Sequence, residues 1–356
     1  MAGKVTLKQI AEQAGVSLTT VHRVLNNKEG CSEALKQKIL AIAQAEGYTI
    51  NLAAASLRKQ TMHIALLAPA HNNGSRYFCD RIWDGYFQFR NEVSQFNVVF
   101  QEYYIGGTDM DAVSAGTVST LKNIYMEHPT HYDGLLIYGL LLDETSAALV
   151  NRIVGSGTQV IILERSPESL SDMCSVTVND CLSGSLAGEL LAKAIHGEGS
   201  VLILNQQLPG GDPNGRACAQ TLAEEHPGLQ VHMLDLPLST HMQSRILEKM
   251  EAIPDLAGVY STCARHTVSL LRALEETAAP RPVLIGSELF EESYQALQAR
   301  RLDAVIDKRP ASLGYKAAQL LFHNLVKGEP LPANYKVTPR IVLRANSDFF
   351  YENQDV

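Results

Sequence analysis

Apolar residues in the first 46 positions recur every three to four residues, the spacing that places them on one face of an α-helix. One such set lies in Leu7–Ala14, a second in Val21–Leu25 and a third in Ser32–Glu46. Gly15 and Ser17 separate the first two sets. Glycine tolerates the left-handed end of a helix, and serine caps a helix start. We therefore expect three helices, the first two of them joined by a tight turn.

The second of these helices leaves four side chains on its outer face: Leu18, Thr19, His22 and Arg23. A tight turn followed by such a face suits insertion into the DNA major groove. Arg23 can bind a guanine edge, and Leu18 or Thr19 can contact a thymine methyl group. His22 either contacts the DNA or is an ordinary exposed histidine. The residues expected to contact phosphates are Thr6, Ser17, Thr20 and Asn26.

From residue 62 onward, short apolar runs alternate with helical patterns. The expected strands are His63–Ala70, Asn97–Tyr104, Gly134–Leu141, Gln159–Leu163, Val201–Asn205, Gln230–Leu236, Gly258–Thr262, Pro282–Gly286, Asp303–Ile306 and Val337–Leu343. The alternation predicts parallel sheets with helices on both faces. The stretch is too long for one such sheet, so we expect two lobes, with ligands at the carboxyl ends of the strands.

Charge is distributed unevenly along the chain. Residues 1–60 contain eight Lys or Arg and four Glu, whereas the remainder contains 22 basic and 34 acidic residues, for a net charge of −8. A positive N-terminal part on an acidic body suits a protein whose N-terminal part alone meets phosphate.

Other features exclude several classes of protein. No apolar run reaches about 18 residues and no secretory signal precedes the first helix, so we expect a cytoplasmic protein without a membrane span. The six cysteines form no C-x-x-C pair, so neither a zinc site nor a redox motif is indicated. Gly155-Ser156-Gly157 precedes a strand and lacks the third glycine of a dinucleotide motif. We expect no cofactor, no metal and no enzymatic activity.

The N-terminal residues resemble the start of the LacI family of bacterial transcriptional regulators. The matching segments are V-T-L at 5–7, I-A at 10–11, A-G-V-S at 14–17, T-V at 20–21 and R-V-L-N at 23–26. The body resembles the type I periplasmic binding protein fold of that family. In that fold the chain crosses between the lobes three times, and we expect the crossings near 165–169, 288–291 and 327–334, with the last strand in the second lobe.

The resemblance implies an α plus α/β fold in three parts. These are a three-helix helix-turn-helix DNA-binding domain at 1–48, a hinge or linker at 49–61, and a doubly wound, two-lobed effector-binding and dimerisation domain at 62–356. The hinge is too short to form a helix alone. In the family it folds when two subunits lie on operator DNA, and Leu57 occupies the position of the leucine wedged into the minor groove. No leucine heptad follows the body, so a homodimer on a roughly palindromic operator is expected.

A ligand rich in hydroxyl groups needs carboxylates, amides, an arginine and an aromatic ring, and the place to look is just after each strand. The residues expected to bind effector are Asn72, Arg76, Phe78, Tyr138, Asp180, Arg216, Thr262, Glu288 and Asp307. Arg216 is the strongest candidate because it fits a family arginine and because a cation at a helix start needs a polar partner. Glu164, Arg165, Cys263 and Lys308 also follow strands.

The sequence departs from the family at Asn179-Asp180, Thr262-Cys263 and Gly286-Ser287-Glu288, so no particular effector can be transferred. We expect a repressor of carbohydrate-use genes controlled by a small sugar or sugar derivative. The alternatives are a purine or nucleoside effector, favoured by Phe78 and Tyr138, or an activator. A solute-binding protein for transport would need a secretory signal and no DNA-binding domain.

Overall fold

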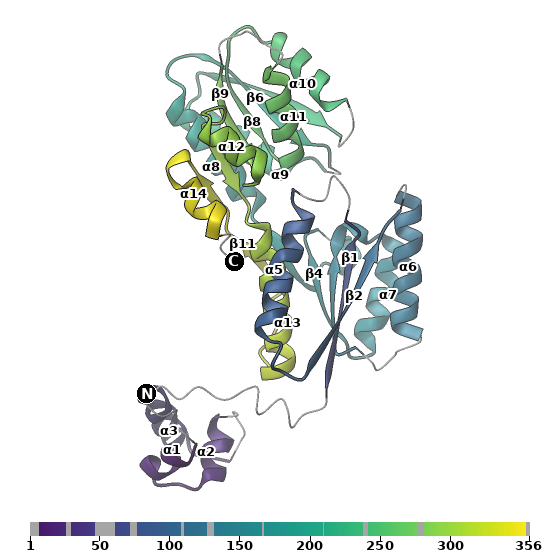
Figure 1. Cartoon of the computed structure of the whole chain (residues 1–356), viewed down its shortest axis with the longest axis vertical. Helices are drawn as coiled ribbons and strands as arrows, with labels where there is room; N and C mark the ends of the chain where they lie inside the picture. The colour runs from purple at the N-terminus through teal and green to yellow at the C-terminus, as the bar shows by residue number, and fades with distance from the viewer. Residues whose placement is uncertain are drawn as a thin grey trace. The chain divides into compact units, whose positions relative to one another are not determined.

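The computed structural model describes residues 7–25, 30–46, 61–71, 77–107, 110–126, 132–165, 167–208, 210–237, 241–275 and 281–353 (Figure 1). The chain divides into a small unit at the N-terminus, which ends at Thr61, and a large unit that begins at Met62. Each unit has its own hydrophobic core.

The N-terminal unit contains three helices, α1 (Leu7–Ala14), α2 (Leu18–Leu25) and α3 (Glu33–Ala45). Ile10, Val21 and Ile39, one from each helix, are fully buried in its core. Gly15 has a φ of 72°, which allows the sharp turn after α1. The Oγ of Ser17 accepts a hydrogen bond from the backbone N–H of Thr20 at 3.1 Å and so caps α2. The predicted helix-turn-helix is confirmed.

The first lobe of the large unit, lobe 1, is a parallel six-stranded sheet with the order β11-β5-β4-β3-β1-β2. Its strands are β1 (Met62–Pro69), β2 (Val98–Ile105), β3 (Gly134–Tyr138), β4 (Gln159–Leu163), β5 (Cys174–Val178) and β11 (Asn334–Val337). Its helices are α5 (Cys79–Glu92), α6 (Met110–Met126), α7 (Glu144–Gly155) and α13 (Pro310–Lys327), with short 3-10 turns at Gly139–Leu141 and Glu168–Leu170. Helices α5 and α13 cover one face and α6 and α7 the other (Figure 1).

Lobe 2 repeats this plan with a sheet of order β12-β10-β9-β8-β6-β7. Its strands are β6 (Gly199–Gln206), β7 (Leu229–Leu236), β8 (Leu256–Ser261), β9 (Val283–Ser287), β10 (Ala304–Asp307) and β12 (Arg340–Val342). Its helices are α8 (Asp180–Ala194), α9 (Pro213–Glu225), α10 (Met242–Glu251), α11 (Ala264–Glu275), α12 (Glu291–Gln298) and α14 (Arg344–Asn353). All strand pairs are parallel except β10 with β12. The predicted two-lobed α/β body is confirmed.

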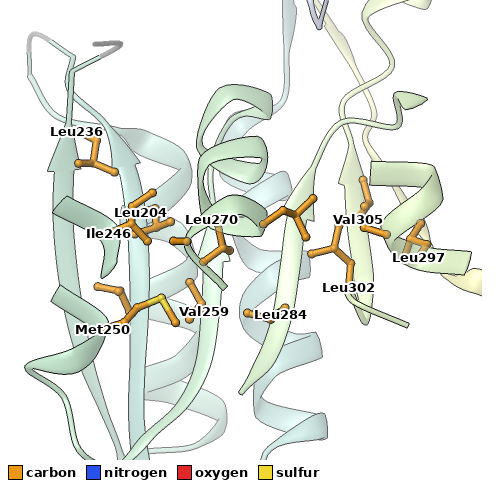
Figure 2. Packing of buried hydrophobic residues seen from close by; sticks show 14 of the residues in the cluster. Leu204, Leu236, Ile246, Met250, Val259, Leu270, Leu284, Leu297, Leu302 and Val305 are labelled. Carbon is orange, nitrogen blue, oxygen red and sulfur yellow. The ribbon is translucent and has the colours of Figure 1, made fainter. Parts of the chain in front are cut away.

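The inner strands of the lobe 2 sheet are buried on both faces, which explains why β6, β8, β9 and β10 are largely apolar. Figure 2 shows one side of this core, where Leu204 and Val259 of the sheet pack with Ile246 of α10 and Leu270 of α11. The other side packs against α8 and α9 through residues such as Leu191. None of the helices in the described part of the chain is long and apolar enough to cross a lipid bilayer.

The nine predicted strands from His63–Ala70 to Asp303–Ile306 each coincide with an observed strand within three residues at either end. The tenth, Val337–Leu343, contains β12, which lies in lobe 2 as expected, but its first residue already ends another strand, β11. β11 ends at Val337 and pairs with β5 of lobe 1, whereas β12 pairs with β10 of lobe 2. The sequence analysis also missed β5, because its apolar residues alternate with polar ones in a five-residue strand.

The chain does cross between the lobes three times, but all three predicted positions are wrong. The crossings follow β5 at Asn179, β10 at Lys308–Arg309 and β11 at Thr338–Pro339. The first predicted crossing came too early because β5, which the prediction omitted, still belongs to lobe 1. The second came too early because β10 belongs to lobe 2 with β9. Each real crossing directly follows the carboxyl end of a strand, so the crossings lie at the same ends of the sheets as the site described below.

Helices α5 and α13 pack closely enough to exclude any side chain at two positions. A Cβ atom on Gly85 of α5 would lie 1.8 Å from the carbonyl oxygen of Ala311, and one on Gly314 of α13 would lie 1.8 Å from that of Ile82. This contact holds α13, the first element after the second crossing, against lobe 1.

Candidate ligand cavity and nucleic-acid interface

A cavity of about 270 Å³ lies at the carboxyl ends of the strands, lined by residues from both lobes. Phe78, Tyr138 and Asp180 line it from lobe 1 or the first crossing, and Thr262 and Glu288 line it from lobe 2. The structure therefore brings together five of the nine residues expected to bind effector. The volume of the cavity is just below the range of about 300–1,000 Å³ that is usual for small-molecule pockets. A ligand the size of a monosaccharide fits this space.

The other four expected residues are not placed in the cavity. Asn72 and Arg76 lie outside the described residues. Arg216 is exposed and does not line the cavity, because α9 already begins at Pro213 and Arg216 follows one turn of helix later. Its Nη1 donates to the carbonyl oxygen of Gly210 at 2.5 Å.

Asp307 is the last residue of β10, directly before the second crossing. It is buried and does not line the cavity. Its Oδ2 accepts from Nε of Arg340 at 2.9 Å, and its Oδ1 accepts from the backbone N–H of Arg309 at 3.2 Å. Arg340 follows the third crossing. Asp307 thus joins the second and third crossing segments, and each of its carboxylate oxygens already accepts a hydrogen bond.

Lys308 is the centre of a buried network at the cavity wall. Its Nζ lies 3.2 Å from Oε1 of Glu288, donates to the carbonyl oxygen of Thr262 at 2.9 Å, and lies 4.0 Å from Oδ1 of Asp180. Burial alone would lower the pKa of Lys308, but the nearby Glu288 and Asp180 carboxylates outweigh burial and raise it, so the ammonium stays charged. Burial raises the pKa of Glu288 to about 7 despite Lys308.

Glu164 and Glu288 occupy equivalent places in the two lobes. Glu164 follows β4 and Glu288 follows β9, and both adopt the left-handed conformation, with φ of 66° and 65°. Each donates its backbone N–H to the neighbouring strand, to Val176 at 2.9 Å and to Ile306 at 3.0 Å. Oε1 of Glu164 is buried without a hydrogen-bond partner among the residues that the structure describes. Burial, followed by repulsion from Asp180, raises the pKa of Glu164 to about 8.

Asp212 holds the loops of lobe 2 in place at the cavity. It accepts from the hydroxyl of Thr262 at 2.7 Å and from the backbone N–H groups of Gln206 and Asn214, both at 3.0 Å. In lobe 1, the thiol of Cys79 donates to the hydroxyl of Tyr138 at 3.3 Å. Burial raises the pKa of Tyr138, so its hydroxyl remains neutral.

The sequence analysis did not single out Asp212 or Arg265, which also line the cavity. Both are near strand ends, since Asp212 caps α9 after β6 and Arg265 is the second residue of α11 after β8. A search that extended from each strand end into the first turn of the next helix would have found Arg265.

The second site is the outer face of α2. Leu18 is 51% exposed although it is a large apolar residue, and Ser17, Thr19 and Arg23 are exposed as well. Thr20 is half-buried, and its hydroxyl lies 2.9 Å from that of Ser17. The predicted groove-facing residues therefore share one solvent-facing surface on a helix. Thr6, Asn26, Leu57 and the side chain of His22 lie outside the described part of the chain.

Comparison with known proteins agrees with this division. The model of the bacterial regulatory proteins of the lacI family matches residues 6–51, and the periplasmic binding protein domain model matches residues 111–330. The probable HTH-type transcriptional repressor ExuR of Bacillus subtilis is 31% identical over 189 residues, which cover 52% of this chain. The chain matches only 48% of the length of that relative.

Solved structures resemble the large unit. A putative LacI transcriptional regulator from Bacteroides fragilis superposes with a TM-score of 0.68 at 16% identity, covering 82% of this chain and 99% of that one. The periplasmic ribose ABC transporter from Conexibacter woesei superposes with a TM-score of 0.69 at 14% identity. The match covers 82% of this chain and 95% of that one. At these identities the likeness concerns the fold, a two-lobed periplasmic-binding-protein-like body.

A helix-turn-helix unit together with such a body defines the class of protein. The chain belongs to the periplasmic binding protein domain family, and its N-terminal unit contains a domain that matches the lacI family of bacterial regulatory proteins.

Proposed function

We propose that the protein is a sequence-specific DNA-binding transcriptional regulator, a repressor of carbohydrate-use genes controlled by a small sugar or sugar derivative. The observation that carries this proposal is the cavity of about 270 Å³, lined from both lobes by apolar, aromatic and charged side chains, in a chain that also has a helix-turn-helix unit. Relatives support it, since one is named the ribitol operon repressor and another the maltose regulon regulatory protein MalI.

On DNA, α2 would lie in the major groove with Leu18, Thr19 and Arg23 against the base edges. Two N-terminal units of a homodimer would contact the halves of a roughly palindromic operator. Residues 49–61 would act as the hinge, with Leu57 entering the minor groove. Because phosphate contacts dominate such binding, affinity should fall steeply with salt concentration.

The ligand would act by changing the angle between the lobes. Residues of both lobes and of the first two crossings line the cavity, so a ligand that contacts all of them has different contacts in open and closed arrangements. A change in lobe angle would alter the spacing of the two hinges in a dimer. The resulting coupling is reciprocal, so DNA must change ligand affinity by the same factor. We assign no reaction and no cofactor to the cavity.

The test begins with selection of bound DNA from a random duplex library. We expect a two-fold symmetric consensus, and Arg23→Ala should lower affinity for it by about tenfold or more, since one bidentate base contact contributes about 1–3 kcal/mol. Arg152→Ala, at an exposed residue of α7, is the control. Ligands that raise the melting temperature should shift operator affinity, and Thr262→Val should weaken that shift. If no sequence is enriched, the proposed function is wrong.

A purine or nucleoside is the second candidate effector. Phe78 and Tyr138 both line the cavity, and the ring of Phe78 lies 5.9 Å from Nζ of Lys308. Nucleosides therefore belong in the same thermal screen. Tight nucleoside binding that Phe78→Leu abolishes would favour this candidate over a sugar.

A further inference from the structure

Most charged groups of the cavity are already paired with an opposite charge or hydrogen-bonded to a neighbour. Nη2 of Arg165 lies 3.2 Å from Oδ2 of Asp180, and Nζ of Lys308 lies 3.2 Å from Oε1 of Glu288. Asp212 accepts hydrogen bonds from the Thr262 hydroxyl and two backbone amides. These groups can orient a ligand, but they require no ligand charge.

Arg265 is different. It lines the cavity and is half-buried, and no ion pair or hydrogen bond joins its guanidinium to any residue that the structure describes. It is also the second residue of α11, a helix of 12 residues. The positive end of the helix dipole disfavours a cation there unless an anion lies opposite. An anion in the cavity would satisfy both the guanidinium and the helix end.

Glu164 supplies the second unpartnered group, from the opposite lobe. Glu164 lines the same cavity, and its Oε1 is buried without a partner among the described residues. A buried polar atom without a hydrogen bond is costly unless a ligand or water completes it. Because the pKa of Glu164 is raised to about 8, this carboxyl is mostly neutral at pH 7 and does not repel an anion.

We propose that the effector is a monocarboxylate sugar acid, an aldonate or a uronate, whose carboxylate is bound by Arg265 and whose hydroxyl groups reach Glu164. This inference rests on the proposed function and specifies its ligand. The planar guanidinium matches a carboxylate through two parallel hydrogen bonds. Arg265 can make one such contact, with one carboxylate of the ligand. A dianion such as a sugar phosphate would leave excess negative charge beside Asp180, Asp212 and Glu288.

The experiment compares matched ligands by isothermal titration calorimetry on the full-length protein. For each of D-glucose, D-galactose and D-mannose, the neutral sugar, the aldonate, the uronate and the 6-phosphate are titrated at pH 7 in constant salt. We expect an acid to bind about tenfold to a hundredfold more tightly than its neutral sugar, the gain usual for a hydrogen bond to a charged group.

Arg265→Gln removes the charge and keeps a hydrogen-bonding amide. It should lower affinity for the acid by about the same factor, a much larger loss than for the neutral sugar, so that the preference for the acid disappears. Arg272→Gln is the control, since Arg272 is exposed in the last turn of the same helix. Glu164→Gln should keep the preference for acids, whereas Glu164→Leu should weaken acid and neutral sugar alike.

Three results would overturn the inference. These are equal or tighter binding of neutral sugars, tighter binding of the 6-phosphates, or an Arg265→Gln variant that binds acids as well as the native protein. A panel in which no acid binds also overturns it. Operator affinity is measured in parallel, so retained DNA binding in any of these cases leaves the proposed regulator standing and discards only the ligand class.

Discussion

Two glutamates at the cavity adopt a backbone conformation that ordinary residues avoid. The left-handed conformation of Glu164 and Glu288 costs about 1–2 kcal/mol for each residue. In both cases the turned backbone still donates its N–H to the adjacent strand, while the side chain borders the cavity. The two lobes thus present a glutamate to the cavity through the same backbone conformation at equivalent points.

Glu164→Gln should change the pH dependence of stability. The folded-state pKa of Glu164 is raised to about 8, above the ordinary value of 4.5, so folding favours the protonated acid. This contribution is complete below the ordinary pKa and is lost as the pH rises through about 8. The amide mimics the neutral acid at every pH. At about pH 8 we expect the variant to be more stable than the native protein by on the order of 1–2 kcal/mol, after allowance for partial exposure.

Urea unfolding at several pH values between about 5 and 8 measures this difference. Glu168→Gln is the matched control, because Glu168 is exposed in the same connection. Parallel pH profiles for the native protein and Glu164→Gln would show that the Glu164 carboxyl is ionised in the folded state.

Only part of the cavity could be predicted from residue types. The rule that ligands meet strand ends selected five residues that do line the cavity: Phe78, Tyr138, Asp180, Thr262 and Glu288. It failed for Arg216 because the direction of a helical side chain depends on where the helix begins, and Asp212 caps α9 earlier than expected. It also failed for Asp307, whose carboxylate is bound by Arg340 from a segment 33 positions away. Such partners are not evident from local sequence.

At the scale of elements, the contact between α5 and α13 depends on two glycines. Gly314→Ala should destabilise the protein by about 1–3 kcal/mol or more, because the new methyl group would meet the carbonyl oxygen of Ile82 at 1.8 Å and force the helices apart. Gly155→Ala is the control. Gly155 ends α7, and its added Cβ would have no heavy atom within 4 Å.

Thermal unfolding measures both variants. We expect a lower melting temperature for the large unit in Gly314→Ala and an equal or slightly higher one in Gly155→Ala, since alanine favours the helix. Equal effects of the two substitutions would contradict the close packing of α5 on α13.

Strands that are long or buried on both faces were predictable, including the eight-residue, partly exposed β2 and β7. β3, β4 and β6 are continuous apolar runs, so their limits were close to correct. β5 and β11 were missed because one is alternating and the other is largely exposed, with only Val337 buried. Their omission displaced the first and third predicted crossings, whereas the second was misplaced because β10, a predicted strand, pairs with β9 in lobe 2.

At the scale of the whole molecule, the two units differ in core size and in charge. The N-terminal unit buries a few side chains around Ile10, Val21 and Ile39, whereas each lobe has a core extending over a six-stranded sheet. Residues 1–60 are net positive and the remainder is net negative. The part expected to bind DNA therefore has both the favourable charge and the smaller reserve of stability.

Differential scanning calorimetry should resolve two unfolding transitions, because each unit has its own core. Ile39→Ala should abolish the first transition and leave the second in place. Ile39 is 0% exposed, and such a truncation costs about 2–5 kcal/mol. A core of this size supplies only about 3–5 kcal/mol in total. Leu40→Ala changes the neighbouring residue, which is 38% exposed, and should leave both transitions nearly unchanged.

The same calorimetry can be repeated with DNA and with an effector present. A duplex that carries the selected operator should raise the first transition, and an effector should raise the second, because each binds one folded unit. With both ligands present, the shifts should depart from independence by the coupling free energy that the regulator needs. If Ile39→Ala lowered the temperatures of both transitions equally, the two units would unfold as one cooperative fold. The N-terminal unit would then have no separate, smaller stability of its own.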